Sequence, residues 1–195
     1  MAPQRRAVLD AWPIVRQAEG IEPADEAIRE LWDPLSARRF AVSVVNLTEA
    51  WLGVAAHDGV AGAEALAIRL ERAVDIDRGS EATAKAAAWI AHAYDVSLGG
   101  AYAAATAMGL EAELWTGDPQ LLCEERIWNA RDVRSESQRR ENRVQAAQGL
   151  FVTGRRAGVL PGASTEQLAE IVRSHLFENP DRWLLREDEG PSPAS

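Results

Sequence analysis

Cysteine is almost absent from this chain, because Cys123 is the only one among 195 residues. A single cysteine excludes an intramolecular disulfide and any metal site built on paired cysteines. Long apolar runs are also missing. The longest uncharged run, residues 96–110, is too short to cross a bilayer, and the N-terminus lacks the apolar segment of a signal peptide. These absences predict a protein of the reducing cytoplasm with no membrane partner.

Several catalytic fingerprints are missing as well, namely G-x-S-x-G, the P-loop and G-x-G-x-x-G. His57, His92 and His175 are scattered without a convincing serine or cysteine partner, which argues against nucleophilic catalysis. The net charge of −9 argues against a surface coated in positive charge for non-specific nucleic-acid binding. A local basic strip is nevertheless present, and a mixed-charge helix face is the favoured interpretation over a phosphate track. It comprises Arg126, Arg131, Arg134, Arg139, Arg140 and Arg143.

What the chain does contain is an alternation of short apolar runs with helical patterns. The apolar runs predict strands at 7–10, 40–45, 74–76 and 112–115. The helical patterns lie at 25–38, 47–56, 61–72, 81–94 and 101–109. Such alternation is typical of an α/β layer structure with a mainly parallel sheet.

The composition changes after Asp118. Residues 119–144 are polar and arginine-rich and are predicted to be helical. Ser164 with Gln167 forms a capping-box pattern, which predicts an amphipathic helix from residue 165 to about 177. We therefore divide the chain into a main domain at 1–125, a helical extension at 126–183 and a disordered tail at 184–195.

Three acids follow the predicted strands. Asp10 and Asp118 lie just past strand ends, and Glu49 lies within one helical turn of a third. Because parallel strands bring their carboxyl ends to one edge, the three carboxylates should converge there, as a hard cation such as Mg²⁺ or Mn²⁺ requires. Each acid has a competing interpretation as a helix cap: Asp10 before Pro13, Glu49 in a capping box with Asn46, and Asp118 before Pro119. Taken together, the three favour a metal site.

Four stretches carry a resemblance to a known family. In order and spacing, VLDAWPIV, VSVVNLTEAWLG, YDVSLGGAYAAATAMG and LWTGDPQL resemble the motifs of the PIN domain, and most closely the VapC-type toxin ribonucleases, over about residues 6–125. The resemblance implies a three-layer α/β/α sandwich and a Mg²⁺- or Mn²⁺-dependent ribonuclease. It assigns Asp10, Glu49 and Asp118 to the catalytic metal site, with Asn46 and Thr116 as polar support. It also implies an RNA substrate, a cognate antitoxin and a homodimer.

Two positions depart from the family pattern. Gly100 occupies the position of an acid in the third block, and a glycine in a helix also costs about 1 kcal/mol relative to alanine. Either the site has lost a ligand and much of its activity, or Asp95 partly substitutes, although Asp95 should face away. Trp12 replaces a small or hydroxylic residue, and it either packs at the rim or offers a stacking face for an RNA base.

Two other functions stay open. Gly100 is compatible with a catalytically impaired PIN module that binds an antitoxin or RNA without cutting it. The segment VLPGASTEQLAEIVRSHLFENPDRW resembles the helical core of Rap1a/Tai-type immunity proteins, which is the basis for a third hypothesis, an interaction protein dominated by its C-terminal part.

Overall fold

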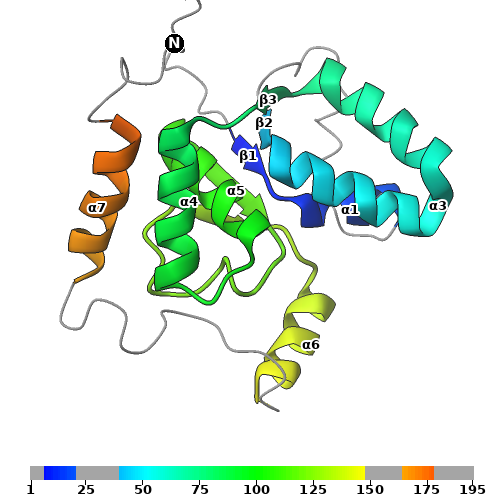
Figure 1. Cartoon of the computed structure of the whole chain (residues 1–195). Helices are drawn as coiled ribbons and strands as arrows, with labels where there is room; N and C mark the ends of the chain where they lie inside the picture. Colours follow the sequence, from blue (N-terminus) through cyan, green and yellow to red (C-terminus); the bar gives the residue numbers. More distant parts are fainter. Residues whose placement is uncertain (1–6, 21–39, 148–163, 178–195) are drawn as a thin grey trace, which may run out of the picture.

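The computed structural model describes residues 7–20, 40–147 and 164–177. Its centre is a five-stranded sheet in the order β3-β2-β1-β4-β5, in which every neighbouring pair is parallel (Figure 1). The strands are β1 (Ala7–Leu9), β2 (Phe40–Ser43), β3 (Asp75–Asp77), β4 (Glu113–Thr116) and β5 (Ala130–Asp132). The α/β fold with a mainly parallel sheet that the sequence predicts is confirmed.

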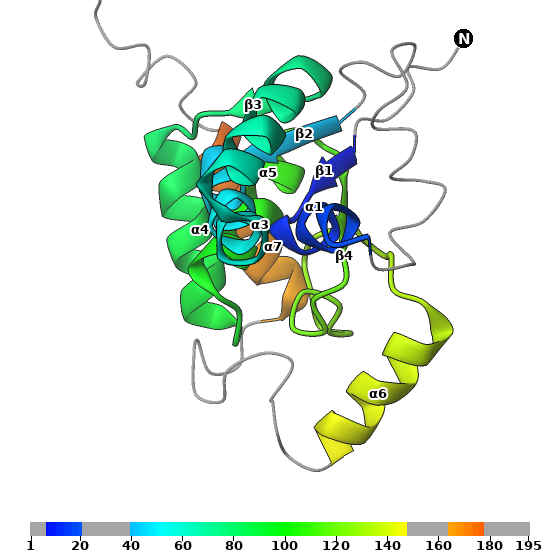
Figure 2. The same ribbon diagram turned by 90° about the vertical axis from the view of Figure 1, so that its right-hand side faces the viewer.

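Helices cover both faces of this sheet (Figure 2). Alternate strand residues enter two separate hydrophobic cores, since Val8 and Leu114 belong to one and Leu9 and Trp115 to the other. The first core also holds α4 (Glu81–Ala93), α5 (Leu98–Gly109) and α7 (Thr165–Phe177), and the second holds α1 (Ala11–Ala18) and α3 (Val44–Ala73). The arrangement is the expected three-layer α/β/α sandwich.

Helix α5 lies between the sheet and its neighbours α4 and α7. Five of its alanines are at most 1% exposed, namely Ala101, Ala103, Ala104, Ala105 and Ala107. A helix surrounded on all sides needs small side chains for close approach. The alanine-rich sequence is therefore explained by position, and the N-terminus of α5 is fixed firmly against the sheet edge.

Helix α3 joins the two helices predicted at 47–56 and 61–72. It bends at Gly59, whose φ of 75° lies in the left-handed region that favours glycine. It also begins earlier than predicted, because Val44 and Val45 are helical and do not continue the strand. The reason is Ser43, whose side-chain oxygen accepts a hydrogen bond from the Asn46 backbone N–H at 3.0 Å and so caps the helix.

The helix predicted over 119–144 is largely wrong. Residues 119–122 form turns, 130–132 form β5, and only α6 (Glu136–Ala147) is helical. Because β5 pairs with β4, the sheet continues beyond position 125, where the main domain was predicted to end.

The capping box at α7 is confirmed. The Gln167 backbone N–H donates to Ser164 Oγ at 3.2 Å, and the Ser164 N–H donates to Gln167 Oε1 at 2.7 Å. Leu168 and Val172 then anchor α7 in the core beside α4 and α5. The helix predicted at 25–38 and the tail at 184–195 lie outside the described residues. None of the helices in the described ranges combines the length and hydropathy that crossing a membrane requires.

Candidate functional site

The strand order reverses between β1 and β4. From β1 the chain builds outward through β2 and β3, and then returns to place β4 on the other side of β1. In open parallel sheets a ligand crevice forms outside the carboxyl ends of the strands at such a reversal. Asp10 directly follows β1, and Asp118 lies two residues past β4. The two acids therefore flank the position where this fold class binds ligands.

Asp10 is held by contacts from both sides of the reversal. Its backbone N–H donates to the carbonyl of Trp115 on β4 at 3.1 Å, and its Oδ1 accepts from the Ala11 N–H at 2.8 Å. Asp10 is thus the N-cap of α1, as one interpretation of the sequence proposed. Asp10 can cap α1 and also belong to a ligand site, because an ionised carboxylate has about four lone-pair positions and the cap uses only one of them.

Asn46 joins Asp10 to Glu49. Its side chain is fully buried, and its amide nitrogen lies 3.2 Å from Asp10 Oδ1 and 3.4 Å from Glu49 Oε2. The same nitrogen donates to the Gly99 carbonyl at 3.1 Å, and the Ser43 hydroxyl donates to Asn46 Oδ1. These bonds orient the amide so that its donor side faces the carboxylates.

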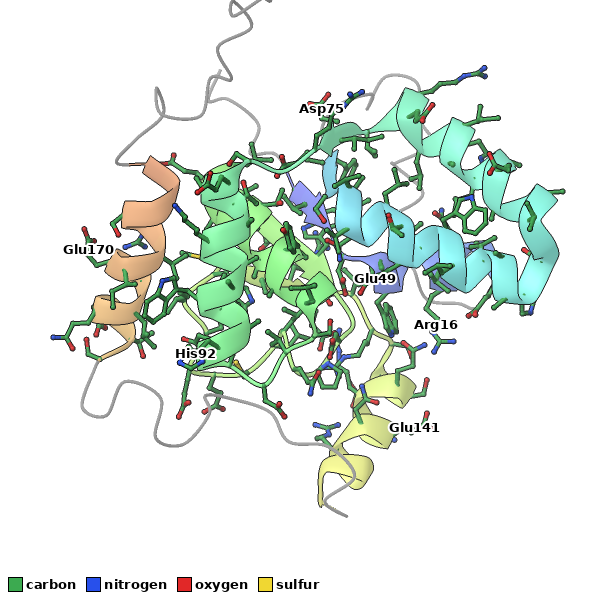
Figure 3. The ribbon with its side chains drawn as sticks, viewed as in Figure 1. Arg16, Glu49, Asp75, His92, Glu141 and Glu170 are labelled. Carbon is green, nitrogen blue, oxygen red and sulfur yellow. The ribbon has the colours of Figure 1, made fainter. Side chains whose placement is uncertain are left out.

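Glu49 does not form the capping box that the sequence allowed. The cap of α3 is Ser43, and both Asn46 and Glu49 lie inside the helix. One turn into α3, Glu49 reaches the start of α5, where a Cβ built on Gly99 would lie 2.0 Å from each of its carboxylate oxygens. Figure 3 shows Glu49 at the centre of the molecule, where α3 approaches α5. Glycine at position 99 is therefore what allows this close approach.

Gly100, the position that the family resemblance singles out, has different neighbours. A Cβ there would lie 3.3 Å from Leu121 Cδ2 and from Ser97 Oγ. Ser97 caps α5, as its spacing suggested, since its Oγ accepts from the Gly100 N–H at 3.0 Å. The glycine that contacts an acid of the site is Gly99, which the sequence did not distinguish from its neighbour. That Gly100 replaces a family acid stays a prediction.

Thr116 links Asp10 to Asp118. The buried Thr116 hydroxyl donates to Asp10 Oδ2 at 2.7 Å and accepts from the Asp118 backbone N–H at 2.9 Å. Asp118 Oδ1 accepts from the Gln120 N–H at 2.8 Å, which makes a local turn. No helix follows Asp118 in residues 119–122, so the interpretation of Asp118 as a helix cap is wrong.

Each of the three carboxyl groups has a pKa above its ordinary value. Burial raises the pKa of Asp10 to about 6, assisted by the charges of Asp118 and Glu49 and opposed by the hydrogen bonds from Thr116 and Ala11. Burial is also the largest cause for Glu49 and for Asp118. The Asp118 charge adds to the raised pKa of Glu49, so all three carboxylates interact electrostatically at one place.

Arg134 is a positively charged residue whose charge acts on Asp118. Its charge lowers the pKa of Asp118, against the larger effect of burial. Asp132 at the end of β5 fixes Arg134 through two bonds, from Nε to Oδ1 at 2.9 Å and from Nη2 to Oδ2 at 2.7 Å. The sequence placed Arg134 in the basic strip without separating it from the other arginines.

The remaining arginines of the strip have local partners. Arg126 Nη1 donates to the Cys123 carbonyl, and Arg140 and Arg143 pair with Glu136 on α6. Arg131 lies over the Trp115 ring, 4.7 Å from its centroid. The mixed-charge helix face that the sequence favoured is therefore confirmed only for the part of the strip on α6, because Arg126, Arg131 and Arg134 lie outside the helices.

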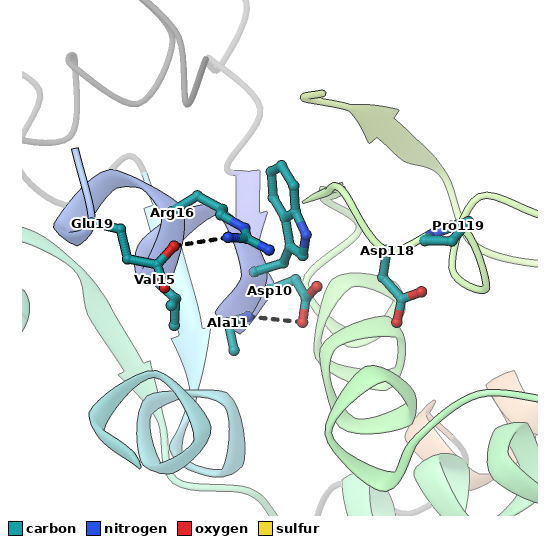
Figure 4. Close-up of a pocket in the computed structure, with 8 residues that line it drawn as sticks. Asp10, Ala11, Val15, Arg16, Glu19, Asp118 and Pro119 are labelled. Carbon is teal, nitrogen blue, oxygen red and sulfur yellow. Dashed lines mark hydrogen bonds and ion pairs between the residues drawn. The ribbon is translucent and has the colours of Figure 1, made fainter. Parts of the chain in front are cut away.

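A cavity of about 360 Å³ opens beside the two aspartates. Asp10 and Asp118 approach it from opposite sides, as Figure 4 shows. It is lined by Asp10, Ala11, Trp12, Val15, Arg16, Glu19, Asp118 and Pro119. The carboxylates are thus accessible to a small ligand at the sheet edge.

The donor chemistry of this cavity fits a hard divalent cation. Mg²⁺ commonly binds through one or two carboxylates together with water and substrate phosphate, and Asp10 and Asp118 supply such a pair. The charge of Asp118 raises the pKa of Asp10 and of Glu49, and such neighbouring carboxylates also gain from a neutralising cation. Within residues 7–20, 40–147 and 164–177, no three His, Cys, Asp or Glu side chains form a cluster ready to hold an ion. Direct coordination by all three acids therefore stays a prediction.

No family model matches this chain, and no curated protein matches it. Solved structures similar to it include VapC20 of Mycobacterium tuberculosis, described as a sarcin-ricin loop cleaving toxin. That match has a TM-score of 0.47 and 18% sequence identity, and it covers 57% of this chain and 91% of the other. The resemblance of the C-terminal segment to immunity proteins finds no support in these comparisons.

Proposed function

We propose that this chain is a Mg²⁺- or Mn²⁺-dependent endoribonuclease of toxin–antitoxin type, which hydrolyses RNA phosphodiester bonds. The observation that carries the proposal is the hydrogen-bonded network at the strand reversal. Asn46 connects Asp10 with Glu49, and Thr116 connects Asp10 with Asp118. The PIN-like motifs of the sequence support the same activity.

Each residue has a defined role in this proposal. Asp10 and Asp118 hold the cation, and Glu49 contributes directly or through water. Asn46 and Thr116 are positioning residues, because they fix the carboxylates through hydrogen bonds and need not contact the substrate. The chemistry that a bound divalent cation supplies is activation of water and neutralisation of charge on the phosphate. In the net reaction, water adds to phosphorus and one phosphorus–oxygen ester bond breaks.

The proposed partners follow from the family resemblance. They are an RNA substrate, a cognate antitoxin protein and a second copy of the chain in a homodimer, all in the cytoplasm. The carboxyl groups alone distinguish none of these partners, because they determine the reaction and not the surface that binds an antitoxin.

Cleavage of a structured RNA in the presence of Mg²⁺ or Mn²⁺ tests this function. We expect the wild-type chain to cleave, EDTA to abolish cleavage, and Asp10→Asn to reduce the rate by roughly 100-fold or more, as removal of central electrostatic groups commonly does. Glu64→Gln, which removes an exposed carboxylate on α3, is the matched control and should cleave like the wild type. Equal activity in the wild type and Asp10→Asn, or activity unaffected by EDTA, would exclude the proposal.

A second candidate is a catalytically impaired module that captures RNA or an antitoxin without cutting. Gly100 favours it, because the family resemblance implies an acid at this position. Gly100→Asp separates the two candidates. A large gain in Mg²⁺ binding and cleavage supports the impaired site, whereas an unchanged, active enzyme argues against it.

A further inference from the structure

A second cavity lies next to the one that holds the aspartates. It has a volume of about 300 Å³ and is lined by Trp12, Arg16, Gln138, Glu141 and Asn142. Trp12 and Arg16 line both cavities, so the two cavities adjoin at these side chains. Arg16 and Glu141 lie on the same side of the molecule in Figure 3. The volume is at the lower end of the range for ligand pockets, roughly 300–1,000 Å³.

Trp12 is partly buried at the edge of the second hydrophobic core, and its neighbours there hold it in place. Its six-membered ring lies against the backbone of Gly117, where a Cβ would come within 2.4 Å of Trp12 Cε3. Arg16, one helical turn further along α1, places its guanidinium carbon 5.7 Å from the centroid of the Trp12 ring. Glu19 fixes this arginine, since Arg16 Nη1 lies 2.9 Å from Glu19 Oε2. The indole is therefore a fixed, partly exposed wall.

The opposite wall is polar and comes from one face of α6. Gln138, Glu141 and Asn142 are spaced three and four residues apart, so they share that face. Gln138 is anchored near the helix start, because its Oε1 accepts from the Ser135 N–H at 3.2 Å. Side-chain amides present a donor and an acceptor in one plane, which matches the edge of a nucleobase.

An aromatic and guanidinium wall facing the two amides and the carboxylate on α6 suits a flat, polar ligand better than an apolar one. Single-stranded nucleic acids are bound in this way, through stacking of bases on aromatic or arginine side chains and hydrogen bonds to the base edges.

We propose that this second cavity is a nucleotide subsite. It holds the base of the single-stranded RNA nucleotide next to the phosphate at Asp10 and Asp118. The ring of the base contacts Trp12 and Arg16, and Gln138 and Asn142 hydrogen-bond its edge. This inference rests on the proposed ribonuclease function and adds a device for choosing the RNA sequence at the cleavage point.

The test measures binding in the full chain carrying Asp10→Asn, which separates binding from cleavage. Fluorescence anisotropy measures the affinity for a labelled single-stranded RNA hexamer of the chain that retains Trp12 and of the variants Trp12→Ala and Trp12→Phe. Because stacking on an aromatic ring contributes about 1–3 kcal/mol per base, Trp12→Ala should weaken binding roughly 5- to 150-fold. Trp12→Phe should retain most of the affinity. A series of hexamers, each with an abasic site at a different position, is measured in the same way. For the hexamer that lacks the base bound in the cavity, the affinity should no longer depend on Trp12.

Two variants on α6 provide a test that does not disturb the core. Gln138→Ala and Asn142→Ala should reduce the preference of the chain among oligomers of A, C, G and U, with little change in thermal stability. Unchanged hexamer affinity in Trp12→Ala, absence of RNA binding in every variant, or the same loss for intact and abasic RNA would each overturn the subsite.

Failure of the subsite differs from failure of the ribonuclease function. If the wild-type chain cleaves RNA with Mn²⁺ and Trp12→Ala cleaves and binds equally well, only the subsite is excluded. If the wild type never cleaves but RNA binding depends on Trp12 and on the base, the cavity stands as a binding site and the nuclease proposal fails.

Discussion

Asp10 occupies a position where its charge is costly. Its side chain is buried, and burial with the neighbouring charges of Asp118 and Glu49 raises its pKa to about 6. The hydrogen bonds from Thr116 and Ala11 offset only part of that cost. A chain selected for stability alone would not concentrate three such carboxyl groups, so their presence at the sheet edge is a reason to look for a ligand there.

The raised pKa of Asp10 predicts how stability depends on pH. The folded state retains the proton up to about pH 6, whereas an unfolded aspartate releases it near pH 4, so stability falls as pH rises through this window. Asp10→Asn removes this loss. We therefore expect the stability advantage of Asp10→Asn over the wild type to grow by about 2–3 kcal/mol between pH 4 and pH 7 without divalent cations.

Urea denaturation of both chains in EDTA at several pH values measures this difference. Titrating groups that do not interact with Asp10, such as Asp132 with its lowered pKa, are present in both proteins and cancel in the comparison. Glu64→Gln controls for the loss of one negative charge at the surface. A difference between the wild type and Asp10→Asn that stays constant from pH 4 to pH 7 would show that Asp10 is not perturbed in this way.

At the scale of single elements, the two adjacent glycines at the start of α5 have different neighbours. Gly99 lies against the Glu49 carboxylate, whereas Gly100 faces Leu121 and Ser97. An alanine at 99 would meet the end of a flexible side chain, so Glu49 should move while the fold persists. An alanine at 100 requires only a small adjustment of Leu121 and gains helix propensity of up to about 1 kcal/mol.

We therefore predict opposite effects for the pair Gly99→Ala and Gly100→Ala. Gly99→Ala should keep its thermal stability and lose roughly 10-fold or more in Mn²⁺ affinity and cleavage rate, because displaced supporting groups commonly have effects of this size. Gly100→Ala should keep both. Titration of Mn²⁺ and RNA cleavage by the two variants check this. Unchanged Mn²⁺ affinity and cleavage rate in Gly99→Ala would mean that Glu49 has no part in the site.

These elements also show how far the sequence could be interpreted. Strands β1 and β2 consist almost wholly of buried apolar residues, and β4 carries buried Leu114 and Trp115, so their runs were recognisable. Strand β5 has only three residues, with Arg131 exposed in the middle, and it carries no apolar signal. Two neighbouring glycines are identical in sequence, and only the path of α3 decides which one meets Glu49.

At the scale of the whole molecule, the site depends on topology. The acids and the Asn46 amide come from the ends of β1 and β4 and from the first two turns of α3, and the strand reversal brings them to one edge. The sequence predicted that edge from the position of each acid after a strand. It could not supply the strand order, because long-range pairing leaves no local pattern, nor the cavity between α1 and α6.

Calorimetric titration of Mn²⁺ at pH 8 into the wild type, Asp10→Asn and Glu64→Gln measures most directly whether the converging carboxylates bind a cation. The account predicts saturable binding in the wild type and Glu64→Gln, weaker binding at pH 5 where Asp10 is protonated, and none in Asp10→Asn. No binding by the wild type, or equal binding by the wild type and Asp10→Asn, would contradict it.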